Sequence, residues 1–408
     1  MSTPMTATTV PPPPAPAGSP VLRVPSIDAF RGFVMFLMLA EVMRLWTLHD
    51  AFPSSGFWAL VAYHTTHVPW QGCSLHDLIQ PAFSFLAGAS LPFSIASRQA
   101  KGESFRKMLG HAVRRSLILV FLGIFLRSMN SPRTYWTFED TLTQIGLGYT
   151  LLFLLAFASR RVQVTAFVVL LVAFWAAFAF YPAPPASFDY PAVGVPADWP
   201  HLYSGFLSHF NKNSNVSWAF DTWFLNLFPR ESPFLFNEGG WSTLSFVPTL
   251  ATMLLGVWAG AWLKSPRTMA EKLRGLVVSG VALTLAGLVL QWVHLCPIVK
   301  RIWTSSYTLY SGGLILLILA GFYAAMEVRG WTRWAFPLMV IGANSIAIYV
   351  MSWTMEHFVS ESLQIHLGKA PFLVLGAPFE PVLRGIGVLL VFWWILHWMY
   401  RKRIFVKI

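Results

Sequence analysis

Histidines and a carboxylate crowd residues 64–81, HTTHVPWQGCSLHDLIQP, just before the chain turns wholly apolar. Imidazole titrates near neutral pH, so His67 beside a carboxylate could take a proton from an amine or hydroxyl that attacks a carbonyl. Asp77 is the natural group to fix the tautomer of that histidine. An exposed loop histidine is the alternative interpretation. A metal site at His64 and His67 lacks a clear third and fourth ligand, so we expect no metal.

Composition places these residues in a membrane protein. Of 408 residues, 55% are hydrophobic and only 11% are charged, whereas a soluble surface carries about 25% charged residues. Apolar stretches of about 20 residues recur along the chain, each long enough to cross about 30 Å of hydrocarbon as a helix. We therefore predict an all-α polytopic fold with about ten membrane-spanning helices, at residues 29–48, 77–97, 113–129, 141–159, 162–181, 241–263, 273–293, 304–326, 335–355 and 380–400.

The positions of the basic residues predict the topology. If the N-terminus lies inside and ten spans alternate, twenty of the 29 Lys and Arg residues fall on the inner side. We therefore expect both termini in the cytoplasm. The net charge of +12 is then explained by topology and by attraction to anionic membrane lipids, and no nucleic-acid partner is expected.

Two segments stand apart from the predicted spans. Residues 1–25, with VPPPPAPAGSP, lack the regions of a signal peptide and are typical of a disordered cytoplasmic tail. The remainder, 26–408, is predicted as one transmembrane domain. Within it, residues 182–240 are too polar and proline-rich to span, which indicates a lid or small subdomain on the outer, periplasmic side. Cys73 and Cys296 both fall outside, where they would pair or, as we favour, remain free thiols.

Ionisable groups within spans mark candidate ligand contacts, because charge in hydrocarbon is costly. Asp28 and Arg31 share one helix face and form either a structural ion pair or a grip on a cytoplasmic ligand. Glu41 and Arg44 repeat this spacing near the outer end of the first span. Snorkelling to the headgroups is the alternative for this second pair.

The first inner loop, SRQAKGESFRKMLGHAVRRS, carries six cations that would suit the phosphates of a nucleotide-like ligand. Positive-inside bias alone accounts for the cations of residues 98–107. Arg114 and Arg115 run into the span itself, so a ligand contact is equally consistent with them.

Three polar residues within spans are also candidates: Gln144 in TLTQIGLGY, and Asn344 and Ser345 in VIGANSIAIY. Hydrogen bonds between helices explain them as well as a ligand contact does.

No Walker-type phosphate-binding loop is present in the sequence, so we do not expect ATP hydrolysis to drive the protein directly.

Six blocks of the chain resemble successive motifs of one family, the heparan-alpha-glucosaminide N-acetyltransferases, which are transmembrane acyltransferases. The resemblance runs in order from residue 26 to about residue 400, and its second block is fairly specific. Bacterial members are associated with N-acetylglucosamine use, and this chain looks like one of them, in the inner membrane. The blocks are SIDAFRGFVMFLML, HVPWQGCSLHDLIQPAFSFLAGASLPFS, TLTQIGLGYTLLF, TLSFVPTLATMLLGVWAG, CPIVKRIWTSSYTLYSGG and FPLMVIGANSIAIYV.

The resemblance implies that the acetyl group of cytosolic acetyl-CoA, a cosubstrate, is transferred to the amino group of a glucosamine-type sugar beyond the membrane. His67 matches the active-site histidine before the Trp-x-Gly and would act as general base or acetyl carrier. Asp77 matches the aspartate at the start of the second span. Glu41 stands where the eukaryotic enzyme has an asparagine, and a carboxylate there would suit an ammonium acceptor.

The remaining contacts follow from threading a slender cofactor through a helical bundle. At the donor end we expect phosphate contacts from Arg31, Arg114 and Arg115, with Gln144, Asn344 and Ser345 lining the path. At the acceptor end we expect Glu41, Trp70, Lys300 and Trp303. The family also suggests a homodimer. The competing functions are an amino-sugar transporter without acetyl transfer and O-acetylation of an envelope glycan.

Overall fold

The computed structural model describes residues 24–406. Helices joined by loops are the regular secondary structure in this range, apart from one isolated antiparallel bridge between Gln71 and Val299. The α-helices are α1 (Pro25–Leu39), α2 (Thr47–Ala51), α3 (Gly56–Thr65), α4 (Ile79–Ala100), α5 (Phe105–Ser128), α6 (Thr141–Phe157), α7 (Arg160–Phe180), α8 (Val216–Phe224), α9 (Phe246–Lys264), α10 (Met269–Trp292), α11 (Ser305–Tyr323), α12 (Phe336–Ala343), α13 (Ser345–Thr354), α14 (Glu356–Leu367) and α15 (Glu380–Arg401). The all-α prediction is confirmed. Most of the predicted tail, residues 1–23, lies outside the described residues.

The protein is a multi-pass membrane protein. Within residues 24–406, seven helices are long and apolar enough to cross a membrane, and an eighth span results if the bent pair α12 and α13 is one. The chain bends by 69° between α12 and α13. The predicted count of ten is not confirmed, because α6 has 17 residues and α1 has 15, which is short for a span. Both helices nevertheless lie where a span was predicted.

Local signals explain where several of these helices begin. Ser104, Ser159 and Asp140 are N-caps whose side chains accept backbone hydrogen bonds at the starts of α5, α7 and α6. Thr268 and Glu271 form a capping box at the start of α10. These polar caps satisfy backbone N–H groups that would otherwise lack partners at the helix ends.

Glycine lets α4 and α9 pack closely. A Cβ at Gly88 would collide with the backbone carbonyl of Met253, and one at Gly256 would collide with that of Phe85. Small residues are how membrane helices bring their backbones together. This contact gives α4, which carries Asp77 just before its first turn, a rigid support.

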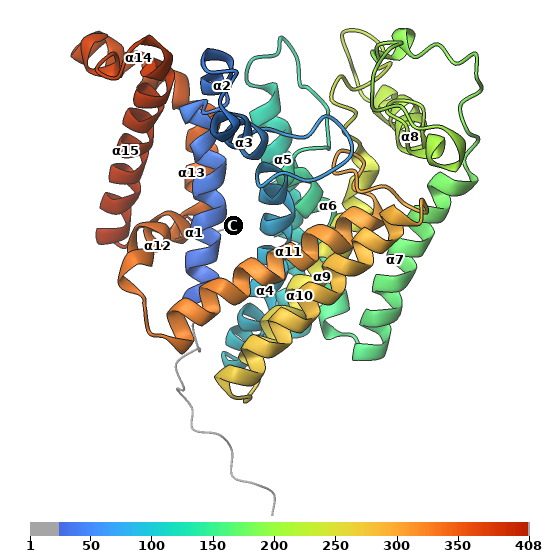
Figure 1. Ribbon diagram of the computed structural model, residues 1–408. Helices are drawn as coiled ribbons and strands as arrows, with labels where there is room; N and C mark the ends of the chain where they lie inside the picture. The colour runs from blue at the N-terminus through green and yellow to red at the C-terminus, as the bar shows by residue number, and fades with distance from the viewer. Residues whose placement is uncertain (1–23, 407–408) are drawn as a thin grey trace, which may run out of the picture.

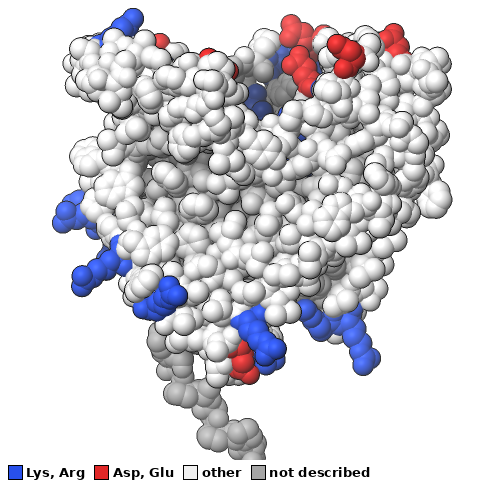
Figure 2. Space-filling model, in the orientation of Figure 1, with Lys and Arg blue, Asp and Glu red and all other residues white. Residues whose placement is uncertain are grey.

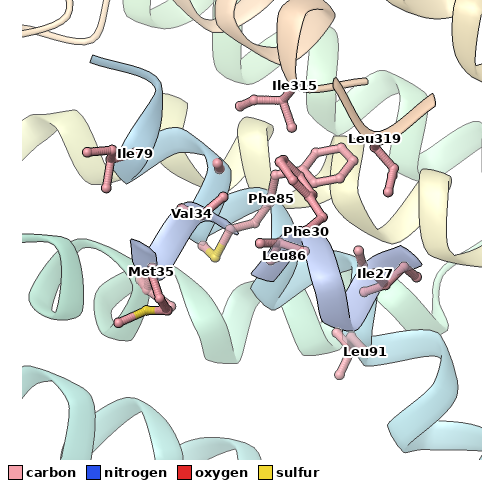
Figure 3. Close-up of a cluster of buried hydrophobic side chains, with 14 of the residues drawn as sticks. Ile27, Phe30, Val34, Met35, Ile79, Phe85, Leu86, Leu91, Ile315 and Leu319 are labelled. Carbon is pink, nitrogen blue, oxygen red and sulfur yellow. The ribbon is translucent and has the colours of Figure 1, made fainter. Parts of the chain in front are cut away.

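The main apolar core lies where α1, α4 and α11 meet (Figure 3). Phe30 and Met35 of α1, Phe85 of α4, and Ile315 and Leu319 of α11 are each at most 1% exposed. Burial of such side chains contributes about 1.5–3 kcal/mol each where water is the alternative. The core therefore fixes α4 relative to the helices around it.

The bundle has two unlike ends. In Figure 1, α3, α8 and α14 lie at one end, which we call the outer face, and the α9–α10 turn and the start of α1 lie at the opposite end, which we call the basic face. Figure 2 shows Lys and Arg side chains gathered at the basic face. The outer face is hollowed, with basic side chains inside the recess and acidic ones along its rim.

The segment 182–240 is ordered and folds over the outer face, with the 3₁₀ turn Gly205–Phe210 and helix α8 (Figure 1). Buried amides hold it: Asn211 accepts from the Tyr203 backbone at 2.7 Å, and Asn215 caps α8. Hydrogen bonds thus stabilise this segment. The two cysteines, Cys73 and Cys296, lie outside it and are free thiols.

Candidate active site

The loop that carries His67 is pinned to a second loop far away in the sequence. Helix α3 ends at Thr65, and Gly72, at φ +119°, donates its backbone N–H to the Ile298 carbonyl at 2.9 Å. The bridge between Gln71 and Val299 follows at once. This pairing places the 64–78 segment next to Lys300, although 233 positions separate His67 from Lys300 in the sequence.

His67 and Asp77 form the pair that the sequence predicted. His67 Nδ1 lies 2.8 Å from Asp77 Oδ1, and the carboxylate is only 1% exposed. The other oxygen, Oδ2, accepts from the backbone N–H of Ser74 at 3.0 Å and of Val68 at 3.3 Å. These donors favour the charged carboxylate. Because a carboxylate only accepts, Nδ1 carries the ring proton and Nε2 is left with the basic lone pair.

Lys300 completes a triad with this pair. Its Nζ lies 3.4 Å from Asp77 Oδ1 and 3.1 Å from His67 Nδ1, and its side chain is 3% exposed. A protonated Nδ1 cannot accept from the ammonium, so the partner of Lys300 is the carboxylate. One buried carboxylate therefore faces two positive or proton-donating groups, which compensates its charge in a site of low dielectric.

Burial and charge both keep His67 neutral. Desolvation lowers the pKa of His67, the Lys300 ammonium lowers it further, and the hydrogen bond to Asp77 opposes these two effects. Desolvation also lowers the pKa of Lys300, against the attraction of Asp77. A lowered pKa leaves His67 unprotonated at neutral pH, which is the state that a base or nucleophile requires.

Two further rings contact the imidazole and Arg301 packs on one of them, and sequence reasoning missed all three. The His76 ring centroid lies 4.4 Å from that of His67, and Trp241 meets His67 edge-on at 5.3 Å. The Arg301 guanidinium lies 4.9 Å from the Trp241 ring, and its Nη1 donates to the Gly239 carbonyl at 2.8 Å. His76 stood in the histidine-rich stretch itself. For Arg301 and Trp241 the signals were the basic pair in VKRIW and an aromatic residue after two glycines in NEGGW.

The predicted acceptor contacts divide into two groups. Lys300 lies at the site, whereas Trp70 donates through Nε1 to the Phe210 carbonyl at 3.2 Å and packs against Trp199. Trp303 donates to Thr252 Oγ1 at 3.3 Å and is 1% exposed. Both tryptophans are thus occupied in holding the outer segments to the bundle. Glu41 is exposed in a 3₁₀ turn at the outer end of α1, and its contact with an acceptor stays a prediction.

Two of the predicted phosphate contacts line one cavity near the basic face, which we call the arginine cavity. It has a volume of about 350 Å³ and is lined by Arg98, Arg114, Arg115 and His111 among others. The Arg115 guanidinium lies over the Tyr149 ring at 4.6 Å, while its Nε is buried without a hydrogen-bond partner. Arg98 is paired with Glu103 at 2.8 Å. The other three basic side chains, all from α5, can bind an anion with more than one phosphate.

The other predicted donor contacts lie elsewhere. Arg31 pairs with Asp28 at 2.9 Å and donates to Ser90 Oγ at 2.8 Å. The Gln144 amide donates to the Phe138 carbonyl at 2.6 Å and to the Thr243 carbonyl at 3.1 Å. These bonds tie the outer end of α6 to the segment before α9, so the amide nitrogen of Gln144 is already engaged.

Asn344 stands at the break between α12 and α13 and is fully buried. Its amide donates to the Ile404 carbonyl and accepts from the Val406 backbone, each at 3.0 Å. Ser345 Oγ donates to the Gly342 carbonyl at 2.9 Å. Asn344 therefore anchors the last described residues of the chain, and the predicted role of both residues along a cofactor path stays a prediction.

Comparison with known proteins gives two relatives. No protein-family model matches the chain. Heparan-alpha-glucosaminide N-acetyltransferase of Mus musculus is 23% identical over 378 aligned positions, covering 82% of this chain, and that of Homo sapiens is 23% identical over 435 positions, covering 95%. The chain spans 54% and 60% of the length of these two proteins. The chain is therefore a distant relative of the heparan-alpha-glucosaminide N-acetyltransferases, as its sequence motifs indicate.

Proposed function

We propose that this protein is a transmembrane acetyltransferase that moves the acetyl group of cytosolic acetyl-CoA to the amine of an amino sugar on the periplasmic side of a bacterial inner membrane. The observation that carries the proposal is the His67–Asp77 pair, in which the tautomer is fixed and Nε2 stays basic. Two curated relatives whose names state N-acetyl transfer to a glucosaminide support the reaction class.

His67 serves in either of two routes. As general base, Nε2 takes the proton that the acceptor nitrogen releases while it attacks the thioester carbonyl; the C–S bond breaks, and coenzyme A leaves as a thiolate that takes up this proton. As acetyl carrier, Nε2 attacks the thioester carbon itself, the C–S bond breaks, and coenzyme A leaves as a thiolate. The acceptor amine then attacks the acetyl carbon and displaces the imidazole, and the proton that its nitrogen loses neutralises the thiolate. Both routes need a neutral imidazole, and the lowered pKa of His67 meets that need.

The donor end of the proposal rests on the arginine cavity. Its residue Arg98 lies near the C-terminus of α4, and Asp77 lies just before the N-terminus of the same helix. A helix of 22 residues is about 33 Å long. Phosphates bound near the basic face would therefore belong to a donor whose slender arm runs most of the bundle's height to reach His67.

The topology supports the assignment of sides. Lys and Arg gather at the face of the arginine cavity (Figure 2), as expected for a cytoplasmic surface. Acetyl-CoA is cytosolic and too polar to cross lipid, so its charged end would bind there. Both chain ends then belong to the cytoplasm, and His67 belongs to the periplasmic side.

The test is acetyl transfer by the purified, vesicle-reconstituted protein, with mass spectrometry of the products. We expect acetyl-CoA and glucosamine to give N-acetylglucosamine, and His67→Ala to lower kcat by about 10²–10⁴-fold. His357→Ala is the matched control, because that histidine side chain is 85% exposed. Uptake of glucosamine into vesicles without acetyl-CoA would favour a transporter. Products acetylated only on hydroxyl groups would favour an O-acetyltransferase.

A further inference from the structure

A second cavity opens near the basic face on the other side of α4. It has a volume of about 390 Å³ and lies between α4, α7 and α9, and Ile95 lines both this cavity and the arginine cavity. Arg160 begins α7 and Lys264 ends α9, so the cavity lies at the level of the helix ends. In a bilayer this is the level of the lipid headgroups of one leaflet.

The two charged residues that line this second cavity are both cations. Arg160 and Lys264 line it, no carboxylate does, and neither cation has a carboxylate partner among the described residues. Lys264 Nζ makes one long contact, to the Pro92 carbonyl at 3.4 Å. The cavity therefore presents two uncompensated positive charges from two different helices.

A polar network holds one of these cations in place. The Arg160 guanidinium lies 4.0 Å from the centre of the Trp258 ring. Trp258 Nε1 donates to Gln163 Oε1 at 2.8 Å, and Gln163 Nε2 donates to the carbonyls of Leu155 and Ala158. Gln163 is only 9% exposed and is itself held by hydrogen bonds, so it fixes the orientation of the Trp258 indole. Stacking leaves the edge of the guanidinium, with its paired N–H groups, free to bind a phosphate.

Apart from the uncharged Gln99, the other walls of the cavity are small and apolar: Pro92, Ile95, Ala96, Ala156, Val257 and Ala261. Next to Arg160, the outward side of α7 is also apolar, with Val162, Val164 and Val168 exposed. A phosphate group joined to an apolar chain matches this arrangement. A zwitterionic headgroup matches less well, because no carboxylate is present to receive its ammonium group.

We propose that this cavity binds one anionic phospholipid of the leaflet at the basic face, with its phosphate between Arg160 and Lys264. The site does not depend on the acetyl-transfer proposal. A lipid bound there contacts α4, α7 and α9 together, so it would stabilise the folded bundle in detergent.

The experiment is lipid binding to the detergent-purified full chain, followed by native mass spectrometry and by thermal unfolding. The probes are phosphatidylglycerol, phosphatidylcholine, inorganic phosphate and coenzyme A. We expect one tightly bound phosphatidylglycerol and a higher Tm with this lipid than with phosphatidylcholine. Arg160→Gln/Lys264→Gln should bind it about tenfold more weakly, as expected from the loss of a charge-assisted hydrogen bond.

The matched control is Lys101→Gln/Arg274→Gln, which removes the same charges from exposed positions outside the cavity and should bind like the wild type. If the double variant at the cavity does not fold, Lys264→Gln alone, at an exposed helix end, tests the same contact. Equal binding of the two phospholipids, or equal loss in cavity and control variants, would overturn the proposal. Displacement of phosphatidylglycerol by coenzyme A or by inorganic phosphate would also overturn it.

Discussion

The two ends of this bundle differ in how their charged side chains are buried and paired. At the outer face, Asp77, His67 and Lys300 are held within 3.4 Å of one another, and the carboxylate and the ammonium are almost fully buried. At the basic face, Arg114 is exposed and Arg115 leaves a buried nitrogen unpartnered. A reacting group needs one fixed geometry, whereas recognition of phosphates needs a surplus of positive charge. The predictions below test whether the two ends have these two roles.

Asp77→Asn should have the largest effect. The amide keeps the shape of the side chain but loses the charge that holds the proton on Nδ1, so the wrong tautomer of His67 becomes available. We expect a loss of about 10³-fold or more in kcat for acetyl transfer. Asp50→Asn, at an exposed position in α2, is the control. Near-wild-type kcat in the Asp77 variant would show that the pair is structural.

Lys300→Met should change the pH dependence. Removal of the ammonium removes one of the two main causes that lower the pKa of His67. The pKa of the histidine should therefore rise, and the acidic limb of kcat/KM should move to higher pH, so that activity on that limb falls. Lys300→Arg keeps the charge and should leave the limb near its wild-type position. An unmoved limb in the Met variant would separate Lys300 from the chemistry.

Arg115→Gln should weaken the donor without slowing the reaction. We expect KM for acetyl-CoA to rise about tenfold and kcat to stay within about twofold, because a phosphate contact outside the reacting centre acts on binding. With S-acetylpantetheine, which lacks the nucleotide phosphates, wild type and variant should behave alike. Arg106→Gln, exposed and outside the cavity, is the control. An equal defect with both donors would contradict a phosphate site.

Arg31→Gln should have the smallest effect. The structure engages this guanidinium with Asp28 and Ser90, so KM for acetyl-CoA should change by less than about twofold, as expected for a part-exposed structural pair. A tenfold rise in KM that disappears with S-acetylpantetheine would return Arg31 to the donor site, as predicted from threading the cofactor through the bundle.

Sequence reasoning identified the residues of one local motif but missed or misplaced those whose contacts depend on the fold. The pair of His67 and Asp77 was predicted because both residues lie within one short segment and one motif. His76 was missed although it lies in the same segment, because spacing alone does not show which histidine rings of a loop come into contact. Trp241 and Arg301 were missed because nothing in the local pattern indicates which distant loops meet. Trp70 and Trp303 were expected at the acceptor, but the structure shows each hydrogen-bonded to another segment of the chain.

The sequence by itself determined the apolar helices, their approximate bounds and the excess of basic residues on one side. Hydrophobicity and charge act locally, through the transfer of each segment into lipid. The spans and their orientation can therefore be predicted without knowing which segments pack together. It also supplied the His67–Asp77 motif.

Only the tertiary structure decided which charges are compensated. Lys300 reaches Asp77 because two loops pair at Gln71 and Val299, and Asn344 is occupied by residues 404 and 406. Electrostatic energy depends on distance and burial, and both are set by packing between segments that are remote in the chain. Basic side chains therefore face a buried carboxylate at one end, and they line cationic cavities at the other.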